Sequence, residues 1–134
     1  MADWPRVSPS AGRRSISSGS PWEAPYGYSR AVVVGDQCWV AGTTDPSGLH
    51  PGDAEGQARA AFAIIEGALA EAGFGLADVV RTRMFVTDAA DAAAVATVHG
   101  QLLGTVRPAA TLLVVSALIE PSLLVEIEVE ARRA

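Results

Sequence analysis

One arginine and a row of glutamates near the end of the chain have the residue types for binding and activating a small acid. Residues 107–131 read RPAATLLVVSALIEPSLLVEIEVEA, with Arg107 opening one apolar run and Glu126, Glu128 and Glu130 alternating through the other. Side chains alternate between the faces of a strand, so the three carboxylates share one face at spacings of roughly 6.6 Å. A guanidinium can hold a substrate carboxylate through two hydrogen bonds, and a carboxylate can act as a general base.

The same residues also have structural interpretations. Arg107 opens a run that we expect to be a neighbouring strand, joined to the glutamate strand by a turn, where it is one candidate counter-ion for the row. Arg81 and Arg83, on one face of another predicted strand, offer cross-strand ion pairs instead. Catalytic and structural roles both stay open for Glu126, and the other two glutamates are interpreted as structural.

Composition narrows the class of protein and of partner. The chain has 134 residues, 49% hydrophobic and 19% charged, which fits one globular domain. Its net charge of -5 argues against a nucleic-acid partner, because binding to a phosphate backbone depends on clustered lysine and arginine. No apolar run reaches the ~18 residues of a membrane span, and no signal-peptide core is present. We therefore expect a cytoplasmic protein without a membrane partner.

The cysteine and the histidines do not have the spacing of a metal site. Cys38 is the single cysteine, so no internal disulfide can form, and its strand QCWV is typical of a small buried thiol. His50 stands in a loop rich in proline and glycine, and His99 stands on a predicted helix, where a half-exposed surface position is favoured over a place in a cleft. Because neither has a second ligand at the right spacing, we expect no metal.

The first half of the chain predicts strands separated by loops. Residues 1–13 mix proline, serine and arginine without a period and are expected to form a flexible arm. Residues 14–18 predict an edge strand, and the following prolines and glycines predict an irregular loop up to Tyr28 that is rich in aromatic residues. Gly35-Asp36 between two β-branched runs predicts a hairpin over residues 29–42.

The second half predicts two helices and three strands. Apolar residues at helical spacing predict one helix, with Asp53 as its N-cap and Gly73 after its end, and a second, alanine-rich helix. Alternation in VVRTRMFVT predicts a strand with Val80, Thr82, Met84 and Val86 on one face. The predicted ranges are helices at 53–72 and 89–102, the latter with a stripe of Ala92, Val95 and Leu102, and strands at 79–87, 109–115 and 125–131.

This order predicts a two-layer α+β fold over residues 14–134, with two helices on one face of a single mixed sheet. The strand 109–115 is apolar at nearly every position and requires cover on both faces. Two helices can cover only one face of the sheet. We therefore expect the other face to meet a second copy of the chain in a homo-oligomer.

From Tyr28 to Ala131 the chain resembles the reactive intermediate deaminases, the RidA or YjgF-like family. The resemblance lies in the order and spacing of GYSRAVVVGDQCWVAGTT, GQARAAFAIIEGALAEAG with ADVVRTRMFVTD, and RPAATLLVV with VEIEVEA. It implies a chorismate-mutase-like fold and a homotrimer with ligand clefts between subunits. It also implies hydrolysis of small enamines and imines, such as 2-aminoacrylate and 2-iminopropanoate, to 2-keto acids and ammonia without a metal or organic cofactor.

The resemblance also implies roles for particular residues. Arg107 resembles the arginine that grips the substrate carboxylate, Tyr28 the aromatic residue of the cleft, and Glu126 the glutamate that positions the water. Ala109 stands where the main chain contacts the ligand in the family, and Gly42 is the glycine of the family's SG motif.

Two positions depart from the family pattern. Ala41 replaces the serine of the SG motif, and Ala96 stands at the asparagine found in many active members. Both changes remove polar groups from the implied cleft. The main hypothesis is a hydrolase like the 2-iminobutanoate/2-iminopropanoate deaminases. A small-acid binding protein of the same fold, which these losses favour, and a specialised biosynthetic enzyme that uses the same cleft remain as alternatives.

Overall fold

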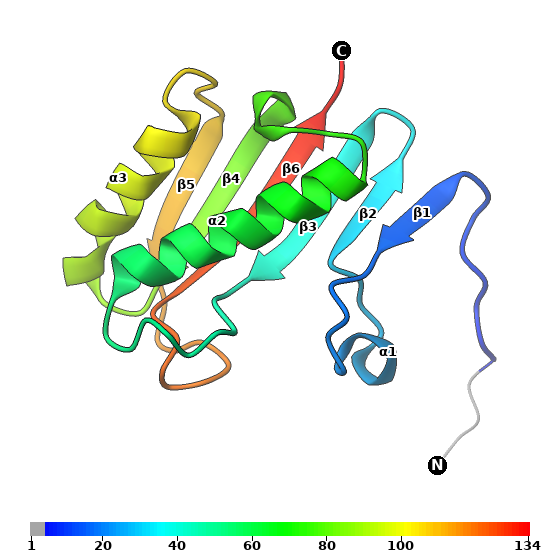
Figure 1. Ribbon diagram of the computed structural model, residues 1–134. Coiled ribbons are helices and arrows are strands. Elements are labelled where there is room, and N and C mark those ends of the chain that lie inside the picture. The colour runs from blue at the N-terminus through cyan, green and yellow to red at the C-terminus, as the bar shows by residue number, and fades with distance from the viewer. Residues whose placement is uncertain (1–4) are drawn as a thin grey trace.

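A six-stranded mixed sheet, covered on one face by two helices, forms the body of the protein (Figure 1). The computed structural model describes residues 5–134. The predicted two-layer α+β fold is confirmed. Its strands are β1 (Arg13–Ile16), β2 (Ala31–Val34), β3 (Gln37–Thr43), β4 (Val79–Val86), β5 (Ala109–Val114) and β6 (Val125–Arg132). Its helices are α1 (Glu23–Tyr26), α2 (Ala54–Glu71) and α3 (Ala92–Leu103), with short 3-10 turns at Leu76–Asp78 and Ala89–Asp91.

The sheet has the order β1-β2-β3-β6-β4-β5, in which β4 and β5 are the one parallel pair within residues 5–134. The expectation that β5 and β6 are neighbours is wrong, because β4 lies between them. The reason is the crossover through α3, which returns the chain parallel to β4 and fills that edge of the sheet. β6 then pairs antiparallel with both β3 and β4 in the middle of the sheet.

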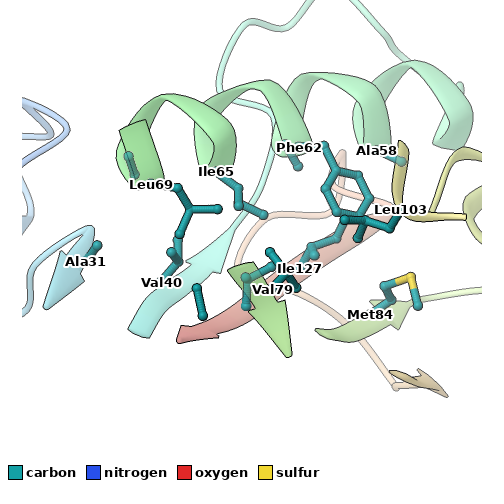
Figure 2. Packing of buried hydrophobic residues seen from close by; sticks show 14 of the residues in the cluster. Ala31, Val40, Ala58, Phe62, Ile65, Leu69, Val79, Met84, Leu103 and Ile127 are labelled. Atoms are coloured by element: carbon teal, nitrogen blue, oxygen red, sulfur yellow. The ribbon is translucent and has the colours of Figure 1, made fainter. Parts of the chain in front are cut away.

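The core lies between the sheet and α2. Asp53 caps α2 as predicted, because its side chain accepts a hydrogen bond from the Gly56 amide. Phe62, Ile65 and Leu69 project from the helix onto the sheet and are essentially inaccessible to solvent (Figure 2). On β6 the apolar members of the alternating pattern are buried and its glutamates are half-buried, so one face of the strand is core and the other is the outer face of the sheet.

Two local predictions are wrong. Val80 is 48% exposed rather than buried, because a register shift between Val79 and Arg81 turns it outward. The loop before Tyr28 contains the one-turn helix α1 with Pro25 inside it. A proline is tolerated there because the first amides of a helix have no partner within the helix. The predicted arm, residues 1–13, includes residues 1–4, which lie outside the described part of the chain, and its last residue, Arg13, begins β1.

β5 is left open within a single chain. It occupies one edge of the sheet, and Leu113 and Val114 are 45% and 56% exposed. An edge strand with exposed apolar side chains and free backbone groups is a surface that natural proteins cover. The predicted cover by a second copy of the chain stays a prediction, and the exposed side chains are consistent with it.

A buried glutamine fixes the segment that leads into β6. The side-chain amide of Gln57, on the first turn of α2, donates to the main-chain oxygens of His50 at 3.1 Å and Ser122 at 3.0 Å. Its side-chain oxygen accepts from the Leu124 amide at 2.9 Å, and the residue is only 4% exposed. This one side chain therefore holds two loops together just before β6 begins.

We predict that Gln57→Met lowers the free energy of unfolding by roughly 2–4 kcal/mol, because it removes the three hydrogen bonds that this buried side chain makes to the backbone of the two loops. Urea denaturation of the purified variant measures this change. Gln101→Met is the matched control: Gln101 is exposed on α3, so the same substitution there is expected to change stability by less than about 0.5 kcal/mol. Equal effects of the two substitutions would show that the clamp contributes nothing.

Candidate functional site

Glu126 lies over a bulge in β3. From Val40 to Thr43 the strand β3 advances three residues, while its partner β6 advances two, from Val129 to Ile127. The extra residue makes a β-bulge at Ala41-Gly42, a device that redirects a strand. A Cβ atom added to Gly42 would lie 2.6 Å from Glu126 Oε2. The carboxylate of Glu126 therefore occupies the space above Gly42, and a side chain at position 42 would displace it.

Arg30, a residue that the sequence did not single out, binds this bulge. Its Nη1 donates to the Gly42 carbonyl at 2.8 Å, to Thr43 Oγ1 at 2.8 Å and to the Ala41 carbonyl at 3.5 Å. The guanidinium carbon also lies 5.8 Å from the centre of the Tyr28 ring, within the range of a cation–π contact. The alternation in SRAVVVG was the available signal, because it places Arg30 on the face opposite the buried Ala31.

Three of the predicted site residues therefore come together around one guanidinium. Tyr28 lies on one side of Arg30, Gly42 accepts a hydrogen bond from it, and Glu126 rests on Gly42. The Tyr28 side chain is 37% exposed, and its hydroxyl lies 3.4 Å from Ser20 Oγ. Tyr28 is thus a partly open aromatic group beside a guanidinium, and not a packed core residue.

The environment of Glu126 favours its protonated form. Partial burial raises the pKa of its carboxyl above the ordinary value, and the negative charge of Glu128 raises it further. The positive charge of Arg30 acts in the opposite direction and lowers the pKa. A carboxyl with a raised pKa can both accept and return a proton closer to neutral pH, which is what general acid–base catalysis requires.

The other glutamates of the row form ion pairs. Arg83 Nη1 lies 3.1 Å from Glu128 Oε1 and 3.4 Å from Glu130 Oε1, so the cross-strand pairs expected from β4 are present. Within residues 5–134 Arg81 makes no such pair, although it stands opposite Glu130. These pairs border a shallow hollow of about 360 Å³ on the outer face, which Tyr28, Trp39 and Ala41 also line. Glu126 stands outside the ion-pair network.

Arg107 lies far from this cluster within one chain. Phe85 of β4 stands opposite Glu126 on one side and Leu113 on the other. Arg107 precedes Leu113 by six residues, which places it roughly 20 Å away along the strand at about 3.3 Å per residue. Ala109 begins β5, level with Glu130 rather than with Glu126. A single chain therefore does not bring Arg107 or Ala109 to Glu126.

The backbone at Arg107 is strained. Its φ of 55° is the one positive value for a non-glycine residue in the described part of the chain, and proline follows it. The Arg107 amide donates to the Leu103 carbonyl at 2.8 Å, which ends α3, and the residue is exposed. Strain of this kind costs on the order of 1–3 kcal/mol and is found preferentially at functional positions.

The two departures from the family pattern occupy different places. Ala41 lines the outer-face hollow next to the bulge, so a polar group is missing from the cluster itself. Ala96 is exposed on α3, in the helix layer and away from the outer face. In a single chain, therefore, only position 41 bears directly on the surroundings of Glu126.

The remaining cysteine and histidines stand apart from the site. Cys38 is fully buried, and burial raises the pKa of its thiol, which makes it a poor nucleophile. His50 Nδ1 lies 2.8 Å from Asp45 Oδ2 in the loop before α2. His99 has the intermediate exposure that was expected, and its ring reaches in toward the sheet, with Nε2 2.8 Å from Thr82 Oγ1. Burial lowers the pKa of its ring. No group of three or more metal-ligating side chains occurs among residues 5–134.

Known proteins match most of the chain. Residues 20–133 match the family model described as endoribonuclease L-PSP. A Streptomyces coelicolor protein described as uncharacterized is 44% identical over 123 residues, which cover 90% of this chain and 92% of that protein. A RutC family protein of Pyrococcus horikoshii is 32% identical over 105 residues, which cover 75% of this chain and 82% of that protein.

Solved structures show the same fold. Rv2704 of Mycobacterium tuberculosis, a member of the YjgF family, has a TM-score of 0.84 and 48% identity, over 90% of this chain and 99% of that one. A Yersinia pestis protein of the Rid family has a TM-score of 0.80 and 28% identity, with the same two coverages. Within residues 5–134 no helix has the length and apolarity needed to cross a membrane, and the expected cytoplasmic location stays a prediction.

We predict that Gly42→Ala lowers the pKa of Glu126, because the new methyl group displaces the carboxylate from its half-buried place into solvent. Carbon-13 NMR of the glutamate carboxyl carbons during a pH titration measures the change. Gly67→Ala is the control, since an added Cβ on this exposed residue of α2 contacts nothing within 4 Å. An unchanged Glu126 titration in Gly42→Ala would contradict the close packing of these two residues.

We also predict that Arg107→Gly is more stable than Arg107→Ala by about 1 kcal/mol, because glycine adopts positive φ without strain. Thermal or urea unfolding of the two variants gives the difference directly. Arg59, on helix α2, is the control position, where the order reverses and glycine is less stable than alanine by about 1 kcal/mol. The same order at both positions would show that Arg107 is not strained.

Proposed function

This chain belongs to the YjgF/RidA family, and from that premise we propose that it hydrolyses small carboxylate-bearing enamines and imines to 2-keto acids and ammonia. One observation carries the proposal. A carboxylate with a raised pKa is held at one end of the outer face, and a strained, exposed arginine stands at the other end. Each is half of a site, and association of chains in a homotrimer can join Arg107 of one copy to Glu126 of the next.

Arg107 is the anchor for the substrate in this proposal. Its planar guanidinium matches a carboxylate in two parallel hydrogen bonds, which fixes the orientation of the adjoining imine carbon. Holding reactants in an attacking geometry can lower a barrier by about 7 kcal/mol. The main chain at Ala109, two residues further along the edge strand, supplies backbone groups to the same ligand.

Glu126 acts as the general base and then as the general acid of the reaction. An enamine first becomes an imine by protonation at carbon, and a water molecule then attacks the electrophilic imine carbon. Glu126 accepts a proton from that water as the carbon–oxygen bond forms, and it returns a proton to the nitrogen. The hydroxyl proton of the resulting carbinolamine then passes through the same carboxylate to the nitrogen, the carbon–nitrogen bond breaks, and a 2-keto acid and ammonia leave. Every atom comes from the substrate and one water, so no cofactor is required.

Tyr28 and Gly42 shape the cleft around these two charges. The Tyr28 ring stands beside Arg30 and provides an apolar wall with a polar edge for a small substrate. Gly42, which has no side chain, leaves the space in which the Glu126 carboxylate lies. The row of glutamates on the same face would repel a phosphate backbone, so the small-acid reaction is favoured over the ribonuclease activity named in the description of the family model.

A second candidate is a protein that binds small keto or carboxylic acids without turnover. The observation that favours it is Ala41, which lines the hollow beside Glu126 where the family's SG motif has a serine. In this case Arg107 would still anchor the ligand, and Glu126 would not turn it over.

The activity is tested with imines generated in solution by an amino-acid oxidase, with release of keto acid measured. Arg107→Ala is expected to reduce kcat/KM by roughly 10- to 100-fold through loss of a charged hydrogen bond, and Glu126→Gln by roughly 10²- to 10⁴-fold. Glu130→Gln, in the same row, is the control and should retain activity. A wild-type protein that binds 2-ketobutyrate through Arg107 but releases no keto acid would establish the binding protein instead.

Mixing two inactive variants tests whether the site is shared. Arg107→Ala and Glu126→Gln chains are unfolded together, refolded at a 1:1 ratio and assayed. If each site takes one residue from each of two neighbouring chains of a trimer, roughly one quarter of wild-type activity should return. Refolded single variants serve as controls. No recovery, with trimers shown by light scattering, would mean that both residues act within one chain.

A further inference from the structure

Arg30 donates hydrogen bonds to three groups next to the proposed site, and neither the motif in which it lies nor the proposed mechanism gives it a role. A β-bulge interrupts the regular ladder of backbone hydrogen bonds, so its carbonyl groups need other donors. Arg30 Nη1 supplies them at Ala41 and Gly42, and the Thr43 hydroxyl donates to the Ala41 carbonyl at 2.8 Å. The guanidinium is therefore part of the structure of the bulge.

The position of the Arg30 side chain is fixed by its backbone pairing with β3 and by the Tyr28 ring. The Arg30 carbonyl accepts from the Ala41 amide at 2.9 Å, so the two residues stand opposite each other at the end of the hairpin. The Tyr28 ring lies against the guanidinium at 5.8 Å. Within residues 5–134, the Nε and Nη2 atoms of Arg30 have no hydrogen-bond acceptor. The side chain is thus held at one nitrogen, with its remaining donors on the open side.

The charges that face Glu126 come from several elements. Glu128, on the same strand, adds negative charge, and it is itself paired with Arg83 of β4. The residue of β4 directly opposite Glu126 is Phe85, which carries no charge. The bulge of β3 contributes no charged side chain, and the loop before β2 contributes the neutral Tyr28. Within one chain, Arg30 is the cation whose charge acts on Glu126.

We propose that Arg30 is the positioning residue of this site: it holds the bulge on which the Glu126 carboxylate lies and supplies the positive charge that balances that carboxylate. The inference rests on the proposed function where it concerns turnover, because Glu126 must be ionised to accept a proton from water. It makes a separate statement about the resting protein, which holds whether or not an imine is ever hydrolysed.

The alternative is that Arg30 only staples the hairpin end to the bulge. That role predicts a loss of stability on substitution without any effect on the titration of Glu126. The two functions of Arg30 can be separated, because lysine keeps the charge but lacks the planar guanidinium, whose Nη1 reaches the bulge while its central carbon lies over the Tyr28 ring. Glutamine keeps a donor and removes the charge.

The experiment measures Glu126 in Arg30→Lys and Arg30→Gln, with Arg132→Gln as the control. Arg132 is an exposed arginine at the far end of β6, where it pairs with Asp36. Carbon-13 titration of the carboxyl groups is run without substrate, and the Glu126 signal is assigned by its absence in Glu126→Gln. We expect the pKa of Glu126 to rise in Arg30→Gln and to stay near the wild-type value in Arg30→Lys and Arg132→Gln.

The pH dependence of kcat supplies the second readout. A reaction that needs ionised Glu126 loses activity as the pH falls through the pKa of this group, so the acidic limb should move to higher pH in Arg30→Gln. In Arg30→Lys the limb should stay in place while kcat falls by about 10²-fold, because the carboxylate is no longer held in position. In Arg132→Gln neither the limb nor kcat should change.

The outcomes separate the two claims. An unchanged Glu126 titration in folded Arg30→Gln would overturn the inference, whatever the activity. Should Arg30→Gln not fold, Arg30→Lys decides: normal kcat with an unshifted limb would overturn it, and a reduced kcat with an unshifted limb would support it. A shifted Glu126 titration in a protein that never releases keto acid would support the role of Arg30 in the resting site and refute the proposed hydrolysis.

Discussion

Three carboxylates lie close together on the outer face of a central strand, and their mutual repulsion constrains the side chains around them. β6 lies in the middle of the sheet, so its glutamates cannot turn away to an edge. One arginine of β4 pairs with Glu128 and Glu130, leaving Glu126 outside that pairing. The third carboxylate is instead placed on a glycine and faced by Arg30 from the hairpin. The structure thus divides the row into two glutamates that share one arginine and a single carboxylate with a raised pKa.

Much of the fold could be predicted because local patterns determine it. Period-2 alternation defined β4 and β6, helical spacing defined α2, and Gly35-Asp36 defined the hairpin, where Gly35 has the positive φ expected of a primed turn. The strand order could not be read in the same way, since a hydrophobic pattern does not say which strands pair. β6 inserts between β3 and β4 because the parallel crossover through α3 leaves β5 at the edge. Local rules do not contain that choice.

The site was predictable as a set of residues but not as an arrangement. Arg107, Tyr28, Gly42 and Glu126 could each be named from the motifs, yet the distance that separates Arg107 from the other three depends on register along β4. The β3 bulge could not be predicted from the sequence either, because one extra residue barely changes the composition or the alternation of the strand. Arg30 was missed for the same reason, since its partners are backbone carbonyls that only the bulge exposes.

The bulge also changes how the absence of a serine at position 41 is understood. From sequence, Ala41 removes a polar side chain from the cleft, which argues against catalysis. In the structure the polar groups at this point are backbone carbonyls, and they are satisfied by Arg30 and by the hydroxyl of Thr43, which is buried. A serine hydroxyl at position 41 would enter a region where strong donors already act on the same carbonyls. The carbonyls at this point of the chain are thus bound by a guanidinium, whose positive charge lowers the pKa of Glu126 against the raising effects of burial and of Glu128.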